Sequence, residues 1–198
     1  MNCISLAFGR EQYTLEIPSK SWQVLKKDLP ALPGKSLHDT VHELVQILRV
    51  YPPKSKILPV VPDHTRKCRL EQILPVLLPP LQTRFSDIEI LVANGSHVLQ
   101  LEEKIRELVS AKVFENFPVY QHDAKDESAL VTVGTTSYGT VIQLNKKAVE
   151  ADVVVTIGGV LYHYFAGFGG GAKMLMPGVA GYESIRTNHS LSIARHNL

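Results

Sequence analysis

Cysteine is scarce in this sequence, and the only two, Cys3 and Cys68, form neither a disulfide framework nor a paired metal-binding motif. The sequence also lacks an apolar run of about 20 residues, the length that crosses a bilayer. Its N-terminus has no basic start followed by a long apolar stretch, as a signal peptide has. These absences favour a reduced, cytoplasmic protein with no membrane partner.

A strong excess of charge of one sign is absent as well. The 21 Lys and Arg residues and 19 Asp and Glu residues leave a net charge of +2, which is too small to indicate nucleic acid or an anionic membrane as a partner. What is present is 44% hydrophobic and 20% charged residues in a chain of 198 residues. This balance and length are typical of one globular domain, or of one domain with a small appendage.

The apolar pattern alternates between strand-like and helical segments. Lys56–Val61, Ile88–Ala93 and Val153–Ile157 are short, continuous apolar runs, typical of strands buried on both faces. Leu70–Leu81, ending at a proline pair, and Glu102–Val109 have the apolar spacing of helices. Strands and helices in this order predict the α/β class, with a Rossmann-like, open, mostly parallel sheet and helices on both faces.

Flanking segments complete the expected organisation. We expect residues 1–35 to form a hairpin and connection packed on the domain, and residues 36–198 to form an α/β cofactor-binding domain. The last helix ends without a cap or polar tail, so we expect a longer protein whose second, C-terminal domain is absent here. Pro59 either weakens the strand prediction for Lys56–Val61 or moves this strand toward a sheet edge. Further elements are expected at Ile4–Phe8 and Tyr13–Ile17 (a hairpin), after the N-cap Ser36 (a helix), at Val131–Gly134 and Thr140–Leu144 (a hairpin) and at Ser184–Arg195 (a helix).

Polar side chains follow each of the three buried strands. Asp63 and Arg66 come after the first, His97 after the second and His163 after the third. Ligands of open α/β sheets bind beyond the carboxyl ends of the strands, so these four side chains are expected to converge on one crevice. Taken singly, each has a structural alternative: a helix cap, a surface ion pair, a turn residue and a histidine bonded to backbone. From the residues alone, the five remaining histidines are treated as structural: His38, His42, His64, His122 and His196.

A glycine-rich segment leads from Phe165 to Lys173. It is not a Walker A loop, because Ala172 and Met174 occupy the positions that need glycine and Ser or Thr. Nor does it follow an ordinary strand–helix turn, as a dinucleotide fingerprint does. Lys173 precedes the apolar run Met174–Pro177. It is either a desolvated, nucleophilic lysine or one whose stem packs on the loop while its charge reaches water.

These motifs, in the same order over roughly residues 56–195, resemble those of the nickel-pincer lactate racemases, specifically their N-terminal catalytic domain. Two positions depart from the family pattern: Lys67 and Tyr162 stand where proline is common, so the substrate need not be lactate. The matching motifs are Asp63-His64-Thr65-Arg66, Ala93-Asn94-Gly95-Ser96-His97, His163-Tyr164-Phe165-Ala166-Gly167, Gly170-Gly171-Ala172-Lys173, Pro177-Gly178-Val179 and Asn188-His189.

The resemblance implies a racemase or epimerase that inverts a small 2-hydroxy acid by hydride abstraction and return. It implies two cofactors, nickel and a pyridinium-3,5-bisthiocarboxylate mononucleotide, the latter carried by Lys173 through a thioamide bond. His189 would complete the nickel coordination, and His97 and His163 would act as acid and base on opposite faces of the substrate. The loop Asp63, His64, Thr65 and Arg66 would contact the cofactor, with Arg66 near the substrate carboxylate.

Two other functions stay open at this stage. One is a zinc-dependent hydrolase built from His97, His163, His189 and Asp63, although the sequence has no H-x-H or H-E-x-x-H pair. The other is a non-catalytic domain, or one half of a split enzyme, that binds a nucleotide-like ligand or a second polypeptide.

Overall fold

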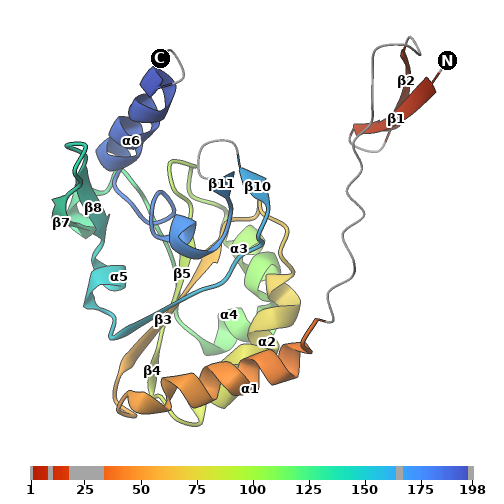
Figure 1. Cartoon of the computed structure of the whole chain (residues 1–198). Helices are drawn as coiled ribbons and strands as arrows, with labels where there is room; N and C mark the ends of the chain where they lie inside the picture. Colours follow the sequence, from red (N-terminus) through yellow and green to blue (C-terminus); the bar gives the residue numbers. More distant parts are fainter. Residues whose placement is uncertain (1, 9–10, 18–33, 164–166, 196–198) are drawn as a thin grey trace. The chain divides into compact units, whose positions relative to one another are not determined.

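The computed structural model describes residues 2–8, 11–17, 34–163 and 167–195. The chain divides into two compact units, Met1–Gly34 and Lys35–Leu198 (Figure 1). In the first unit, β1 (Asn2–Phe8) and β2 (Glu11–Ile17) pair antiparallel, which confirms the expected hairpin. That this hairpin packs on the larger unit stays a prediction.

A five-stranded sheet forms the centre of the larger unit. Its strands are β3 (Lys56–Pro62), β4 (Asp87–Ile88), β5 (Ile90–Ala93), β6 (Val119–Gln121) and β9 (Val153–Thr156). All neighbours are parallel, and β3 lies between β9 on one side and the pair β4 and β5 on the other. The α/β class and the mostly parallel sheet are therefore confirmed.

The edge position that Pro59 predicts for its strand is wrong, because β3 is central and pairs on both sides. Ile57 pairs with Ile88 and Val60 with Leu91, so Pro59 lies beside the break at Glu89 that separates β4 from β5. The missing proline N–H thus coincides with a point where the ladder is already interrupted. Glu89 itself is held by Lys56 (3.1 Å) and Lys147 (2.9 Å).

Four α-helices cover one face of the sheet. They are α1 (Leu37–Ile47), α2 (Leu70–Gln82), α3 (Glu102–Val109) and α4 (Ala111–Asn116), with the 3-10 turn η1 (Leu48–Val50) after α1. Ser36 caps α1 as expected, because its Oγ accepts the N–H of Asp39 at 3.1 Å. Pro79 and Pro80 lie inside α2 rather than ending it. Buried leucines of α2, Leu74, Leu77, Leu78 and Leu81, pack into the main core and offset the lost N–H bonds.

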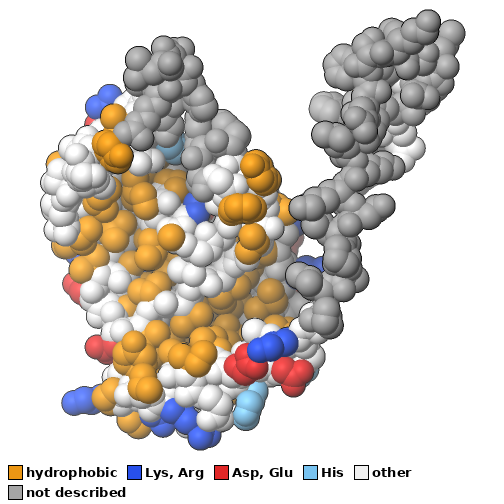
Figure 2. Space-filling model, in the orientation of Figure 1, with side chains coloured by type: hydrophobic (Ala, Val, Ile, Leu, Met, Phe, Trp, Pro, Cys, Tyr) orange, Lys and Arg blue, Asp and Glu red, His pale blue; other side chains and the backbone are white. Residues whose placement is uncertain are grey.

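The other face of the sheet is covered by shorter elements. Leu58 and Leu91 pack there against Met174 and Val179, and Figure 2 shows hydrophobic side chains gathered over the face where β3 and β9 run. The elements that pack on this face are α5 (Lys146–Glu150) and η3 (Gly171–Met174). The second predicted hairpin is confirmed, since β7 (Leu130–Thr135) and β8 (Val141–Asn145) pair antiparallel. The remaining elements described in the larger unit are η2 (Glu127–Ala129), β10 (Tyr162–His163), β11 (Gly167–Phe168) and α6 (Tyr182–Arg195).

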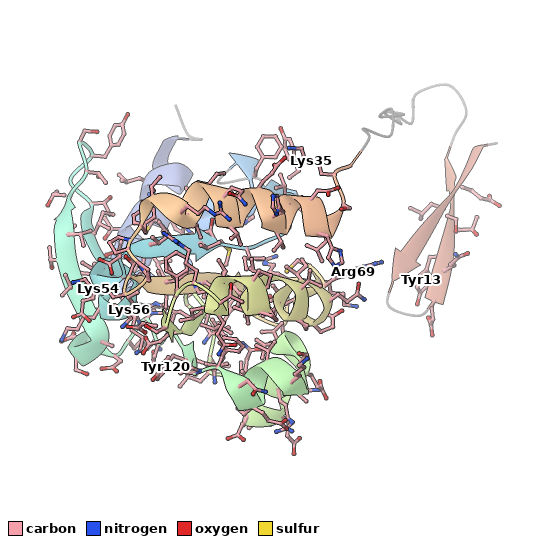
Figure 3. All side chains as sticks on the ribbon, turned by 90° about the horizontal axis from the view of Figure 1, so that it is seen from below. Tyr13, Lys35, Lys54, Lys56, Arg69 and Tyr120 are labelled. Atoms are coloured by element: carbon pink, nitrogen blue, oxygen red, sulfur yellow. The ribbon has the colours of Figure 1, made fainter. Side chains whose placement is uncertain are left out.

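The two ends of the sheet differ in what surrounds them. Figure 3 shows Lys56, at the start of β3, and Arg69, which precedes α2, at opposite ends of the larger unit. The strands' carboxyl ends lie at the Arg69 end, where the loops after β3, β5 and β9 meet. None of the helices among the described residues is both long and apolar enough to cross a membrane.

Candidate functional site

A cleft of about 440 Å³ opens at the carboxyl ends of β3, β5 and β9. The chain leaves β3 toward β5 on one side and later returns to place β9 on the other, so the cleft lies where the strand order reverses. Such a switch point is the usual ligand site of an open α/β sheet. The predicted site residues that line the cleft are Asp63, Arg66, His97, His163, Lys173 and His189.

Asp63 and His97 form the most tightly bonded pair in the cleft. The Asp63 carboxylate is only 3% exposed. Its Oδ2 accepts a short hydrogen bond from Nδ1 of His97, and its Oδ1 accepts the N–H and hydroxyl of Thr65 at 3.0 and 2.5 Å. Burial raises the pKa of Asp63, but the bonds from Thr65 and His97 outweigh it and hold this pKa below its usual value. Asp63 is therefore a buried carboxylate that orients His97, not the cap of α2, whose N-cap is Arg69.

The loop between β5 and α3 presents His97 to the cleft. Asn94 to His97 form a turn closed by the N–H of His97 on the carbonyl of Asn94 at 3.0 Å. Gly95 has φ +56°, a conformation that a residue with a Cβ rarely adopts. Because Nδ1 of His97 is engaged by Asp63 and the side chain is 52% exposed, Nε2 is the nitrogen available to a ligand.

Arg66 lines the cleft without an ion-pair partner among the described residues. Its main-chain N–H is bonded to the carbonyl of Asp63 at 3.1 Å, which holds the loop in a turn. The surface ion pair that is the commoner fate of an arginine is therefore not formed here. An uncompensated guanidinium beside a cleft favours an anionic ligand.

Lys173 and His163 line the same cleft, and the charge of Lys173 acts on His163. Burial lowers the pKa of Lys173, and the nearby Arg66 lowers it further. Burial also lowers the pKa of His163, with Lys173, Arg66 and His189 acting in the same direction. The lysine therefore has a larger neutral, nucleophilic fraction than an exposed lysine, and the histidine is held in its neutral, basic form.

His64 and Thr65 do not line this cleft. Nδ1 of His64 is bonded to Oε1 of Gln100 at 2.6 Å, and Thr65 is engaged by Asp63. Both residues hold the loop after β3 in place. Of the other segments singled out in the sequence, residues 164–166 and His196 lie outside the described residues.

A half-buried network of amide side chains next to the cleft gave no signal in the sequence. Gln100 donates through Nε2 to Oδ1 of Asn94 at 2.9 Å and exchanges two main-chain bonds with the side chain of Gln121, at 2.8 and 2.9 Å. Asn94 donates to the carbonyl of His122 at 2.9 Å. The network ties the loops after β3, β5 and β6 together. Gln100 and Gln121 belong to no motif, so only the fold reveals their role.

Gly178 belongs to a motif singled out in the sequence, and the structure gives the reason for the glycine. A Cβ at this position would lie 2.2 Å from the carbonyl oxygen of Met174. Only glycine therefore allows the chain after Lys173 to turn back on itself. Gly178 also accepts the N–H of Gly95 at 2.8 Å, which joins the Lys173 segment to the His97 loop.

The described residues of the site do not form a metal centre by themselves. Within the described ranges, no group of three or more His, Cys, Asp or Glu side chains is arranged to hold a metal ion. A structural or catalytic zinc site normally takes at least three protein ligands. The zinc-hydrolase alternative therefore has no support in the described geometry.

The sequence and fold of this chain can be compared with those of known proteins. The family model of the lactate racemase N-terminal domain matches residues 8–198. The lactate racemase of Lactiplantibacillus plantarum is 36% identical over 139 residues, which are 69% of this chain and 33% of that protein. The lactate racemase of Thermoanaerobacterium thermosaccharolyticum is 33% identical over 138 residues, which are 69% of this chain and 32% of that protein. The chain thus spans about a third of the length of these curated relatives.

Two solved structures are similar in fold. The lactate racemase apoprotein from Thermoanaerobacterium thermosaccharolyticum superposes with a TM-score of 0.78 at 26% identity, over 95% of this chain and 46% of that one. A protein from Thermotoga maritima superposes with a TM-score of 0.69 at 24% identity, over 80% of this chain and 41% of that one, and shows similarity of fold alone. In both matches this chain covers less than half of the other chain.

Proposed function

Because the chain belongs to the lactate racemase N-terminal domain family, we propose that it is the part of a 2-hydroxy-acid racemase that holds the cofactor and supplies the acid and base. The observation that carries the proposal is the content of one cleft. It holds three histidines, an arginine without an ion-pair partner among the described residues, and a lysine with a lowered pKa. The substrate would be a small 2-hydroxy acid such as lactate.

The cofactor we propose is nickel held by a pyridinium-3,5-bisthiocarboxylate mononucleotide, tethered at Lys173. The residues present fit such a group. The lowered pKa of Lys173 favours the neutral amine that a covalent tether requires, and the imidazole of His189, in the same cleft, is a normal nickel ligand. The absence of a three-residue metal site among the described residues fits a metal whose other ligands belong to the cofactor.

When bound, this group supplies the acceptor and then the donor of the hydride at the hydroxyl-bearing carbon. The protein's own task is to move the hydroxyl proton. His97 takes it through Nε2, and the buried carboxylate of Asp63 on Nδ1 stabilises the imidazolium that forms. On the other face His163, kept neutral by its surroundings, plays the same part for the mirror-image substrate.

Arg66 is proposed to hold the substrate carboxylate. A guanidinium binds a carboxylate through two parallel hydrogen bonds, which sets the orientation of the ligand as well as its position. Asp63 and Thr65 would help to position Arg66, because the hydrogen bonds between them hold the loop that carries Arg66 beside the cleft. His64, bonded to Gln100, would support cofactor binding through the position of this loop.

The test is the mass and metal content of the chain made in a host that also produces the cofactor-synthesis proteins. We expect a mass gain that peptide mapping places on Lys173, and about one nickel per chain. Lys173→Arg keeps the charge but cannot form the thioamide, so it should lose both signals. His189→Ala should keep the mass gain and lose nickel.

An unmodified Lys173 in that host would overturn the proposal. Zinc at full occupancy with an unmodified lysine would favour the hydrolase instead. A metal-free, unmodified chain that still binds a nucleotide would favour the non-catalytic alternative. Interconversion of lactate enantiomers by the loaded chain, lost in His97→Ala and in His163→Ala, would extend the support from cofactor binding to catalysis.

A further inference from the structure

His122 lies outside the cleft, directly after β6, and its side chain is completely buried. Both ring nitrogens are engaged. Nε2 donates to the carbonyl of Ala180 at 2.9 Å, and Nδ1 accepts from Nδ2 of Asn145 at 3.2 Å. An amide N–H can only donate and a carbonyl can only accept, so these bonds require the neutral Nε2–H form. Burial, which lowers the pKa of His122, acts in the same direction.

The main chain of His122 is bonded to β5 and to the loop that presents His97. Its N–H donates to the carbonyl of Val92 in β5 at 2.9 Å, and its carbonyl accepts Nδ2 of Asn94 at 2.9 Å. Asn94 begins the turn that presents His97. The backbone of this single residue therefore anchors the His97 loop.

The ring of His122 anchors the Lys173 segment. Ala180, which accepts the ring N–H, pairs with Leu144 and follows Val179, whose carbonyl accepts the N–H of Asn145 at 2.9 Å. The turn from Lys173 to Gly178 is closed by the N–H of Gly178 on the carbonyl of Lys173 at 3.0 Å. A short, hydrogen-bonded stretch of chain thus connects Ala180 to Lys173, so the position of Ala180 affects that of Lys173.

A buried imidazole costs desolvation free energy that an apolar side chain of similar size would not. Here every polar atom of the ring has a partner, so the imidazole specifies one arrangement of its neighbours. We propose that His122 is a positioning residue that sets the separation between the His97 loop and the Lys173 segment. In the proposed function, on which this inference rests, His97 moves the proton and Lys173 carries the cofactor.

The pH profile of Lys173 labelling tests this inference without cofactor, nickel or substrate. Acetic anhydride acylates the neutral amine, and peptide mass spectrometry gives the rate at Lys173 between pH 7 and 11. The charged group that acts on this amine is Arg66, and the amine in turn acts on His163, which Arg66 and His189 also affect. Burial and Arg66 should hold the apparent pKa of Lys173 below 10.5 in the unaltered chain. Loosening the segment should hydrate the amine and raise that apparent pKa.

His122→Phe fills the same space with a ring but removes both side-chain hydrogen bonds. We expect the apparent pKa of Lys173 to rise and its labelling rate at pH 8 to fall by roughly three- to tenfold, since tenfold corresponds to one pKa unit. His122→Gln, whose amide can donate to Ala180 and accept from Asn145, should keep the original profile. Phe85→Leu, a fully buried change in the core on the helical face, is the matched control and should leave the profile unchanged.

An unchanged Lys173 profile in a folded His122→Phe protein would overturn the inference, and so would an equal change in Phe85→Leu. Should His122→Phe fail to fold, Asn145→Ser replaces it. Serine can still cap α5, where Asn145 Oδ1 accepts the N–H of Lys147 at 3.0 Å, but it is too short to reach the imidazole. An original profile in Asn145→Ser would also overturn the inference. Because no cofactor takes part, this outcome is independent of whether Lys173 is modified in the cofactor-producing host.

Discussion

At the scale of single residues, the site depends on buried polar groups whose partners lie far away in the sequence. Asp63 is bonded to Thr65 in its own loop and to His97 in the next one. His122 joins Ala180 and Asn94 in the same manner. A buried group of this kind stabilises the fold only while it keeps both its charge state and its partner, which makes its removal measurable.

Replacing Asp63 with asparagine keeps the shape but removes the charge that accepts the bond from His97. The folded-state pKa of Asp63 lies below its usual value of 3.8, so its stabilising effect is complete well above that pH and is lost as the pH falls through the folded pKa. We expect Asp63→Asn to lower the free energy of unfolding by about 1.5–3 kcal/mol at pH 7 and by less at pH 3.5. Urea denaturation at both pH values measures the difference. An equal loss at the two pH values would contradict the assigned role of the charge.

His122 should make the fold sensitive to mild acid. Its folded-state pKa lies below the usual 6.5, so the unfolded chain takes up a proton first as the pH falls. The stability contributed by the neutral imidazole is therefore complete above about pH 6.5 and decreases below it. His122→Gln, which does not titrate, should lose less stability than the unaltered chain between pH 7.5 and 5.5. Thermal unfolding followed by circular dichroism at the two pH values tests this, and parallel losses would refute it.

At the scale of elements, the glycines of the segment before and after Lys173 allow tight turns and close packing of the main chain. Gly170 has φ +72° and lies against the carbonyl of Gly159, where an added Cβ would approach to 3.2 Å. Gly178 has no room for a Cβ at all. The segment is therefore a tightly packed turn that presents Lys173, and the covering of β3 by Met174 and Val179 fixes it to the sheet.

The turn at Gly178 gives the sharpest prediction at this scale. Gly178→Ala would bring a Cβ to 2.2 Å from the Met174 carbonyl oxygen and 2.6 Å from its carbon, so main chain must move. We expect a loss of about 2–5 kcal/mol of unfolding free energy. Gly159→Ala is the control in the same cleft, because its Cβ would meet only the Cβ of Cys68, at 3.8 Å. Its effect should stay within about 1 kcal/mol. Similar urea midpoints for the two variants would contradict this account of the turn.

At the scale of the whole molecule, each hydrophobic core cluster that the described residues form lies within the larger unit. The members of all three clusters fall between Leu37 and Ile185. We therefore expect residues 35–198, expressed without the first 34, to unfold cooperatively, with a melting temperature within about 2–4 °C of that of the full chain, the shift that 1 kcal/mol causes in a domain of this size. Calorimetry of both forms is the measurement. A broad, non-cooperative transition of the shorter form would show that the hairpin is needed for folding.

Much of the fold could be predicted because its signals are local. The apolar runs at Lys56–Val61 and Val153–Ile157 identify β3 and β9 to within a residue, and the spacing of Glu102–Val109 identifies α3 with its observed bounds. The short elements α4 and β6 escaped prediction, because a few residues hold too little periodicity to separate a strand or helix from a loop. The edge position predicted from Pro59 was wrong for a related reason. The cost of a proline in a strand depends on whether the neighbouring strand could bond at that point, and the break at Glu89 lies in a neighbouring strand.

The sequence by itself determined the α/β class, the apolar strands and the polar residues that follow them, because side-chain burial and strand direction act along neighbouring residues. It could therefore nominate Asp63, Arg66, His97 and His163 for one crevice. Only the tertiary structure decided which of them pair, that His64 and Thr65 hold a loop instead of facing the cleft, and that His122 bonds to Ala180, 58 positions further along the chain. Hydrogen bonds between distant segments depend on three-dimensional distance and on burial, neither of which is a function of sequence spacing.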